Sequence, residues 1–171
     1  KFFKILILLL LNFLFIHTLT LSIEEKIKIG LLVPLTGEDK EIGNQIIQSV
    51  RIALKDINSS KIEIYPKDTA SNSDKTLKSA IELKENGVQI VIGPVFYKNL
   101  INLNKVEDLI FVSLTNKTLN LSKNIISGGI NATSQLNAIK KFIKSNEIKK
   151  TIFLTPKLDY EIEVKKAIKQ S

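Results

Sequence analysis

The sequence predicts an α/β fold with a parallel, Rossmann-like open sheet flanked by helices. Residues 27–37 read IKIGLLVPLTG, an apolar strand that stops at a proline and turns through Thr-Gly toward a helix beginning near Gly43. Residues 89–94 read QIVIGP and repeat the arrangement of a buried strand, a Gly-Pro stop and a helical stretch. Parallel neighbours need a long crossover, usually a helix, so two such units indicate a parallel sheet. Ligands of open parallel sheets bind at the carboxyl ends of the strands, where the turns PLTG and GPVFY lie.

The first strand is expected over residues 26–33, and the helix after it over residues 42–58. Apolar residues recur along this helix at the spacing of one buried stripe, namely Ile46, Ile47, Val50, Ala53, Leu54 and Ile57. The second strand is expected over residues 62–65, where Ile62 and Ile64 alternate with charged residues as in an edge strand. The polar loop KDTASNS follows it.

Ser73 or Asp74 can cap the next helix, which is expected to end at Asn86 with Gly87 as its left-handed stop. After it we expect a strand over residues 89–93, a short helix over 97–104, a strand over 109–112 and a strand over 125–127. The alternation of strands and helices again favours a parallel sheet.

The stretch 128–131, which begins with Gly-Gly, is the predicted domain boundary. Residues 23–130 would form an N-terminal α/β lobe, and residues 131–171 the truncated start of a second, similar lobe. In this second part, Ser134 is expected to cap a helix running to Ile143, and residues 151–155 are expected to form a sixth strand.

Residues 1–22 have the layout of a secretory signal peptide. Lys1 and Lys4 precede an apolar run over residues 5–16, and small polar residues lead to Ser22, where cleavage is expected. The alternatives are an uncleaved membrane anchor and a buried helix, but about 12 apolar residues are few for a hydrocarbon core of ~30 Å. The sequence therefore predicts a periplasmic protein with no stable membrane span after signal cleavage. The absence of cysteine excludes a disulfide or a lipidated cysteine within these residues.

The positive charge is concentrated in the last quarter of the chain. The formal net charge is +8, and residues 131–171 hold 9 lysines against 4 acidic residues. A nucleic-acid surface would combine arginines and aromatic residues for bidentate contacts and stacking, yet Arg51 is the only arginine. We therefore expect a solvated lysine surface and no nucleic acid, with an anionic partner as the alternative.

Several residues that many enzyme mechanisms use are absent from the expected mature chain. His17, the only histidine, lies in the predicted signal peptide, so no Ser-His or Cys-His nucleophile and no histidine metal site is available. The first turn lacks both the GxGxxG and the GK[ST] sequences that bind nucleotide phosphates. Asp68 is the best placed acidic residue, either as a cap of its own loop or as a functional contact. We expect no catalytic residue, no metal and no cofactor.

Three motifs taken together resemble the leucine/isoleucine/valine-binding protein family of type I periplasmic binding proteins. They are IKIGLLVPLTG at 27–37, the helix with Gly43 near its start and ALKDIN at 53–58, and VIGP at 91–94. The resemblance covers residues 26 to about 165. It implies two α/β lobes around a cleft, of which this chain would hold the N-terminal lobe and the start of the second.

Three further segments are most similar to the branch of this family called penicillin-binding protein activators. They are YPKDT at 65–69, GVQIVIGPVF at 87–96 and VSLTN at 112–116. This branch is implicated in regulating cell-wall synthases rather than in delivering amino acids to a transporter. Its best-known members are lipoproteins, whereas this chain has no cysteine to lipidate.

The resemblance also implies a ligand site at the strand ends. In amino-acid-binding members, hydroxyl residues and backbone N–H groups after the third strand hold the ligand carboxylate. The matching positions here are Val95, Phe96 and Tyr97, which lack the small hydroxyls. Ser113 and Thr115 match the loop after the fourth strand, which binds the ligand ammonium.

The predicted ligand-binding residues are Thr36, Phe96, Tyr97, Ser113 and Thr115. Thr36 is expected at the cleft edge after the first strand. Packing of a helix start is the alternative role for Phe96 and Tyr97, and loop capping is the alternative for Ser113 and Thr115.

The sequence thus favours a non-enzymatic, exported regulator of cell-wall synthesis, similar to the penicillin-binding protein activators, with a penicillin-binding protein as its partner. The alternative is the substrate-binding subunit of an ABC transporter for branched-chain amino acids or amides. That protein would have a transporter permease as its partner and a small amino-acid-like ligand.

Overall fold

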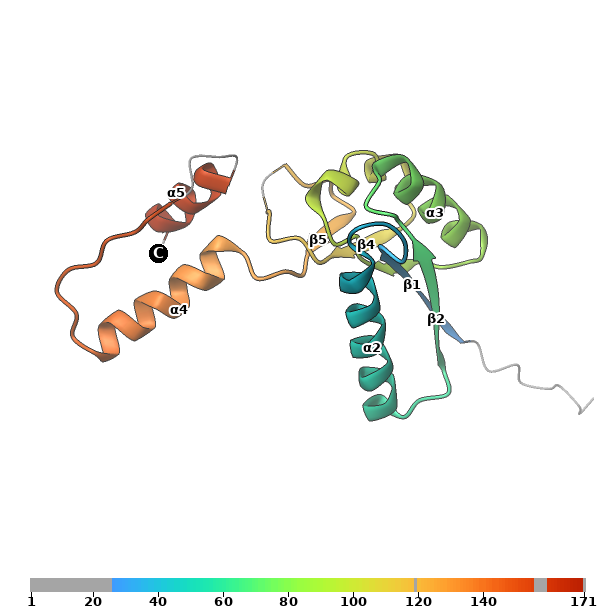
Figure 1. Ribbon diagram of the computed structural model, residues 1–171, viewed down its shortest axis with the longest axis horizontal. Helices are drawn as coiled ribbons and strands as arrows, with labels where there is room; N and C mark the ends of the chain where they lie inside the picture. Colours follow the sequence, from blue (N-terminus) through green and yellow to red (C-terminus); the bar gives the residue numbers. More distant parts are fainter. Residues whose placement is uncertain (1–25, 119, 156–159, 171) are drawn as a thin grey trace, which may run out of the picture.

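The computed structural model describes residues 26–118, 120–155 and 160–170 (Figure 1). The predicted signal peptide, residues 1–22, lies outside the described residues. The elements in chain order are β1 (Ile27–Val33), α2 (Lys40–Ile57), β2 (Ile62–Asp68), α3 (Ser73–Glu85), β3 (Ile90–Ile92), the 3-10 turns η1 (Tyr97–Leu100) and η2 (Leu103–Lys105), β4 (Ile110–Ser113), β5 (Ile125–Ser127), α4 (Ala132–Ser145) and α5 (Tyr160–Gln170).

The five strands form one parallel sheet in the order β2-β1-β3-β4-β5. β2 lies at one edge, as its alternating pattern predicted. The pairing aligns Val33 with Asp68 and Ser113 with Ser127, so the ends of neighbouring strands lie along one edge of the sheet. The predicted α/β fold with a parallel open sheet is confirmed.

Helices α2 and α3 lie on opposite faces of this sheet, as the right-handed rule for parallel crossovers requires. The chain leaves β1 toward the β2 edge and then returns past β1 to β3, so the two connecting helices lie on opposite sides. We call the α3 side the covered face. Its main core joins Leu83 of α3, Val91 of β3 and Phe111 of β4, all fully buried, with Leu103 of η2. No residue of α2 belongs to that core.

On the other side, which we call the open face, α2 is the only described helix that packs against the sheet. Four of its isoleucines, one from each of β1, β3, β4 and β5, remain 41–55% exposed: Ile27, Ile90, Ile110 and Ile126. Strand register puts them on the same side, because Ile90 pairs with Ile110 and Val112 pairs with Ile126. One helix is too narrow to cover a five-stranded sheet.

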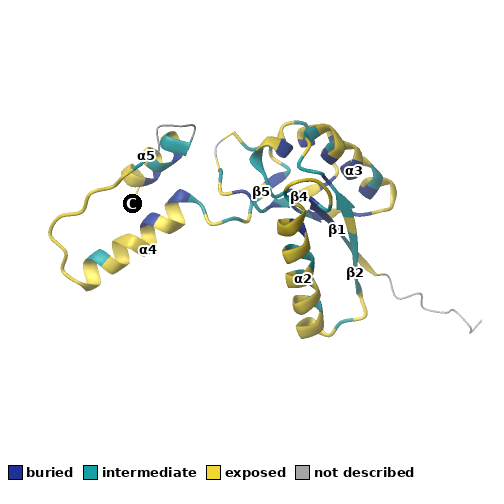
Figure 2. Cartoon of the chain, in the orientation of Figure 1, coloured by how far each residue is buried: buried dark blue, intermediate teal, exposed yellow. Residues whose placement is uncertain are grey.

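The predicted buried stripe of α2 is therefore wrong in part. Figure 2 shows that most of α2 is exposed, and Gly43 is its only buried residue. The half-buried members of the stripe are Ile46, Ile47, Val50 and Leu54, whereas Ala53 and Ile57 are exposed. The apolar periodicity predicted the helix correctly but not the depth of its burial.

Asparagines, not the predicted serine and aspartate residues, cap two of the helices. The side chain of Asn72 accepts a hydrogen bond from the N–H of Lys75 at the start of α3. The side chain of Asn131 accepts one from the N–H of Ser134 at the start of α4. The predicted stop after α3 is confirmed, since Gly87 has a positive φ of 77°.

Two further elements differ from expectation. The predicted helix over 97–104 is instead the pair of short turns η1 and η2. Leu100, Leu103 and Val106 are buried and three residues apart, which matches the three-residue repeat of a 3-10 turn. The predicted strand over 151–155 is not formed, and Leu154 is 95% exposed. A strand needs a neighbour for its backbone hydrogen bonds, and no described strand pairs with this segment.

Helices α4 and α5 follow the sheet and pack on each other (Figure 1). Leu136 of α4 and Ala167 of α5 are buried in their small shared core. Glu163 of α5, also buried, accepts hydrogen bonds from the N–H of Thr118, at 3.0 and 3.1 Å to its two oxygens. The predicted domain boundary at residue 130 falls between β5 and α4, and it stays a prediction.

Candidate ligand-binding edge

The carboxyl ends of the strands carry all five predicted site residues. Thr36 follows β1, Phe96 and Tyr97 follow β3, and Ser113 and Thr115 lie at and just after the end of β4. Because the strands are parallel and in register, their following turns open at the same edge of the sheet. We call this the ligand edge.

Two glycines let backbone segments approach closely there. A Cβ atom at Gly43 of α2 would lie 1.8 Å from the carbonyl oxygen of Pro34. A Cβ atom at Gly93 would lie 2.2 Å from the carbonyl oxygen of Leu32, and Gly93 has a φ of +103°. The start of α2 and the turn after β3 are thus held directly against β1.

Asp68, at the end of β2, holds the turn after β1. Its Oδ1 accepts hydrogen bonds from the N–H groups of Leu35 at 2.7 Å and Thr36 at 3.2 Å, and its Oδ2 accepts the hydroxyl of Thr36 at 2.6 Å. It also accepts from the N–H of Ala70 at 2.9 Å and pairs with Lys75 at 2.5 Å. Partial burial raises the pKa of Asp68, but the hydrogen bonds from Lys75, Thr36 and the backbone outweigh it and hold the pKa well below its ordinary value. Asp68 therefore caps its own loop, which was one of the two roles expected from the sequence. It also fixes the turn after β1.

A second contact joins the same two turns, and the sequence did not predict it. Ser71, after β2, donates its hydroxyl to Oδ2 of Asp39, after β1, at 2.6 Å. Both residues lie in polar turns that follow neighbouring strands, which is the only sequence signal for the pair. Their contact depends on the register that aligns Val33 with Asp68.

Ser113 and Thr115 are buried and bonded to the backbone. The Oγ of Ser113 donates to the carbonyl oxygen of Pro94 at 3.1 Å and accepts from the N–H of Thr115 at 3.2 Å. The Oγ1 of Thr115 accepts from the N–H of Lys117 at 3.3 Å. Both side chains make the local bonds expected of loop caps, and their role toward a ligand stays a prediction.

Phe96 and Tyr97 are half-buried after β3, each beside a lysine. Tyr97 packs against the main core, and the Nζ of Lys117 lies 4.4 Å from the centre of its ring. The Nζ of Lys98 lies 5.7 Å from the centre of the Phe96 ring. Core packing and a cation–π contact therefore occupy part of the Tyr97 ring, and a cation–π contact occupies part of the Phe96 ring.

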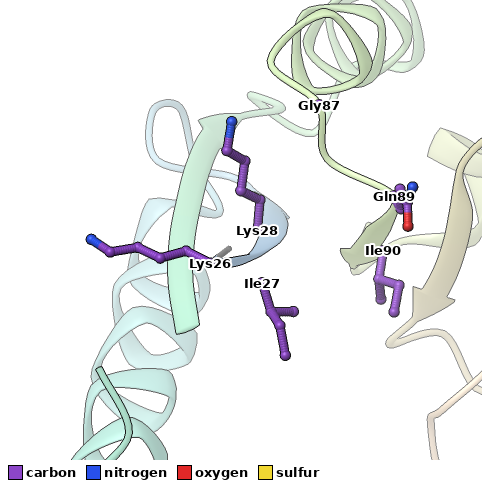
Figure 3. Close-up of a pocket in the computed structure, with 6 residues that line it drawn as sticks. All are labelled: Lys26, Ile27, Lys28, Gly87, Gln89 and Ile90. Atoms are coloured by element: carbon purple, nitrogen blue, oxygen red, sulfur yellow. The ribbon is translucent and has the colours of Figure 1, made fainter. Parts of the chain in front are cut away.

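A cavity of about 250 Å³ lies at the opposite, amino edge of the sheet (Figure 3). Its lining residues are Lys26, Ile27, Lys28, Gly87, Gln89 and Ile90. The Nζ of Lys28 donates to the carbonyl oxygen of Asn86 at 2.9 Å, and Lys26 pairs with Glu63 at 2.5 Å. The ammonium groups of Lys26 and Lys28 are thus already bonded within the protein, and no predicted site residue lines this cavity. The cavity is therefore a weaker candidate for a ligand site than the ligand edge.

Within the described residues, no group of three or more His, Cys, Asp or Glu side chains is arranged to hold a metal ion. The described helices also include none with the length and hydropathy needed to span a membrane.

A parallel sheet with helices on both faces and turns gathered at its carboxyl edge defines the class as an α/β lobe of the ligand-binding type. The sequence model of the family described as periplasmic binding protein matches residues 26–171. The chain belongs to the periplasmic binding protein family, which confirms the resemblance seen in its motifs. No curated protein sequence matches this chain significantly.

Several solved structures share the fold. The C-domain of LpoA from Haemophilus influenzae, described as a regulator of PBP1A, has a TM-score of 0.66 at 21% identity, covering 82% of this chain and 44% of that one. A solute-binding protein of an ABC transporter from Rhodopseudomonas palustris BisB5, in complex with 3,4-dihydroxybenzoic acid, has a TM-score of 0.62 at 24% identity, covering 85% and 43%. The leucine-binding protein LivK from Thermotoga maritima has a TM-score of 0.58 at 18% identity, covering 84% and 45%. This chain spans less than half the length of each.

Proposed function

We propose that this chain belongs to a non-enzymatic periplasmic protein that regulates cell-wall synthesis by binding a penicillin-binding protein, as in the penicillin-binding protein activator branch. The observation that carries this proposal is the character of the ligand edge after β3 and β4. Phe96 and Tyr97 stand where an amino-acid receptor would present small hydroxyls, and Ser113 is buried with its hydroxyl bonded to Pro94 and Thr115.

A hydrogen bond to a charged group contributes about 1.5–3 kcal/mol, so each missing contact to a ligand carboxylate lowers affinity by roughly tenfold or more. An edge with bulky rings in these positions is poorly suited to clamp a free amino acid. The similarity in fold to the LpoA C-domain, a regulator of PBP1A, supports a regulatory role.

Affinity capture from detergent-solubilised host membranes tests this proposal. The immobilised full-length protein should retain a penicillin-binding protein, detected with a fluorescent penicillin. A matched column of a solute-binding protein of the same family is the control. Equal retention on both columns would contradict a regulatory role.

The second candidate is a substrate receptor of an ABC transporter. It is favoured by the similarity in fold to LivK and to the Rhodopseudomonas palustris solute-binding protein. Here the two lobes would close on a small ligand by hinge motion.

A thermal-shift screen of the full-length protein separates the two candidates. A receptor should gain about 2.7 kcal/mol of stability at a ligand concentration 100 times its Kd. A clear shift with leucine or a related amino acid would overturn the regulator proposal. The variant carrying Phe96→Ser and Tyr97→Ser should change the ligand response only if an amino-acid pocket exists.

A further inference from the structure

Two turns at the ligand edge are joined by hydrogen bonds from hydroxyl groups to carboxylates. The turn between β1 and α2 contains Thr36 and Asp39, and the turn between β2 and α3 begins at Asp68 and contains Ser71. Thr36 donates its hydroxyl to Asp68 at 2.6 Å, and Ser71 donates its hydroxyl to Asp39 at 2.6 Å. We call these four residues the hydroxyl–carboxylate clasp. Each turn supplies one hydroxyl and one carboxylate to the other.

Both bonds are short and charge-assisted, which makes them stronger than bonds between neutral groups. A threonine or serine hydroxyl has a single proton and two acceptor lone pairs. Once Thr36 has donated that proton to Asp68, its oxygen can act toward any further group only as an acceptor. The same holds for Ser71 and its bond to Asp39.

The turn between β2 and α3 has an unusual backbone conformation that surrounding contacts must stabilise. Ala70 and Ser71 have φ values of 44° and 54°, a left-handed conformation that non-glycine residues rarely adopt in succession. The N–H of Ala70 donates to Asp68, and the N–H of Ser71 donates to Thr69 Oγ1 at 3.3 Å. Such conformations persist where the surrounding contacts over-determine them.

We propose that the clasp is the positioning element of the ligand edge: it fixes the turn after β1 against the turn after β2 and sets the Thr36 hydroxyl as a hydrogen-bond acceptor. Asp68 and Asp39 are positioning residues in this arrangement. The significance of the clasp for binding rests on the second candidate function, a receptor that holds a small ligand at this edge. The clasp itself is a property of the free protein.

Amide hydrogen exchange of the full chain, followed by mass spectrometry, tests the clasp without any ligand or partner. Thr36→Val and Ser71→Ala each remove one hydroxyl and should raise exchange at least threefold in peptides covering residues 34–40 and 69–73. The double variant should raise it further. Peptides covering β3 and β4 should exchange as in the wild type.

Two controls separate positioning from general stability. Thr36→Ser keeps the hydroxyl and should restore protection. Ser49→Ala removes an exposed hydroxyl that bonds within its own helix, so both turns should keep their protection. Exchange that rises equally across the whole sheet in the Thr36→Val chain would overturn the positioning role.

A double variant tests the bond between Thr36 and Asp68. An ionised carboxylate can only accept, so Thr36 is the donor wherever this bond is made. Thr36→Val should therefore lose most of its effect when Asp68→Ala has already removed the acceptor. Additive effects of the two changes would show that the bond is not made and would overturn the acceptor assignment. Failure to capture a penicillin-binding protein would overturn the proposed function and leave these exchange results unaffected, so the two proposals fail separately.

Discussion

The two faces of the sheet are built from equally apolar strands, but they differ in what lies over them. On the covered face, Val91 and Phe111 are fully buried beneath α3 and the 3-10 turns. On the open face, Ile90 and Ile110, their immediate neighbours in sequence, are 41% and 47% exposed. Adjacent residues of one strand therefore have very different environments, because successive side chains point to opposite faces.

The difference shows that the crossovers, and not the strands, decide where the core of this chain lies. Three consecutive connections, from β2 through β5, run in one direction across the sheet and add to the covered face. A single connection, from β1 to β2, runs the other way and supplies α2 to the open face. The exposed isoleucines follow from that imbalance.

The largest change in the free energy of unfolding is expected at two neighbouring residues of β4. Phe111→Ala should destabilise the chain by about 3–5 kcal/mol, because it removes a fully buried ring and leaves a cavity. Ile110→Ala, at the half-exposed neighbouring position, should cost about 1 kcal/mol. Urea unfolding of both variants measures the contrast. Similar losses at the two positions would mean that the open face is buried in solution.

A smaller effect is expected where α2 meets β1. In an ordinary helix, replacing glycine by alanine stabilises by up to about 1 kcal/mol. Gly43→Ala should instead destabilise by roughly 1–3 kcal/mol, because its Cβ would lie 1.8 Å from the carbonyl oxygen of Pro34. Asn44→Ala, one residue along the helix, is the matched control. A stabilised Gly43→Ala chain would show that α2 is not fixed against the end of β1.

The contribution of Asp68 should depend on pH. Its pKa is lowered in the folded chain, chiefly because the hydrogen bonds from Lys75 and Thr36 outweigh its partial burial. A carboxyl group with a lowered folded pKa stabilises fully above its ordinary pKa of about 4, and this stabilisation is lost as pH falls through the folded value. Asp68→Asn should therefore cost roughly 2 kcal/mol at pH 7 and clearly less at pH 2.

Urea midpoints of the wild type and Asp68→Asn at both pH values give that comparison. Asp56→Asn, at an exposed position in the last turn of α2, is the matched control variant. A gap between wild type and Asp68→Asn that stays constant down to pH 2 would contradict the account of Asp68.

The smallest change in stability is expected on the open face itself. Ile126→Thr keeps a β-branched residue at a position that is 55% exposed, so stability should change by no more than about 0.5 kcal/mol. Binding of a hydrophobic dye should fall, because the variant removes apolar surface. A loss above 1 kcal/mol would show that another segment covers Ile126 in solution.

Much of the fold could be predicted from local patterns. The strand motifs IKIGLLV and QIVIG, the edge character of β2 and the glycine stop after α3 all appear as expected. Each depends on interactions between near neighbours in sequence, such as alternation along a strand or the conformation of one glycine. The predicted site residues lie at the turns after β1, β3 and β4, as expected, because strand ends and stops are local signals, whereas their role in binding stays a prediction.

The remaining features depended on distant contacts. The stripe predicted for α2 is only partly buried because burial depends on the surface that packs against it. The strand predicted at 151–155 is not formed because a strand needs a partner. The bonds from Thr36 to Asp68 and from Ser71 to Asp39 each join residues 32 positions apart.

The sequence by itself determined the parallel α/β architecture, since periodicity and turn chemistry are encoded locally, and its motifs carried the resemblance to the periplasmic binding protein family. Only the tertiary structure decided which face of the sheet is buried and which hydroxyls at the ligand edge are already bonded. The physical reason is that both burial and hydrogen bonding require two parts of the chain to be in contact. The direction of each crossover decides which parts meet.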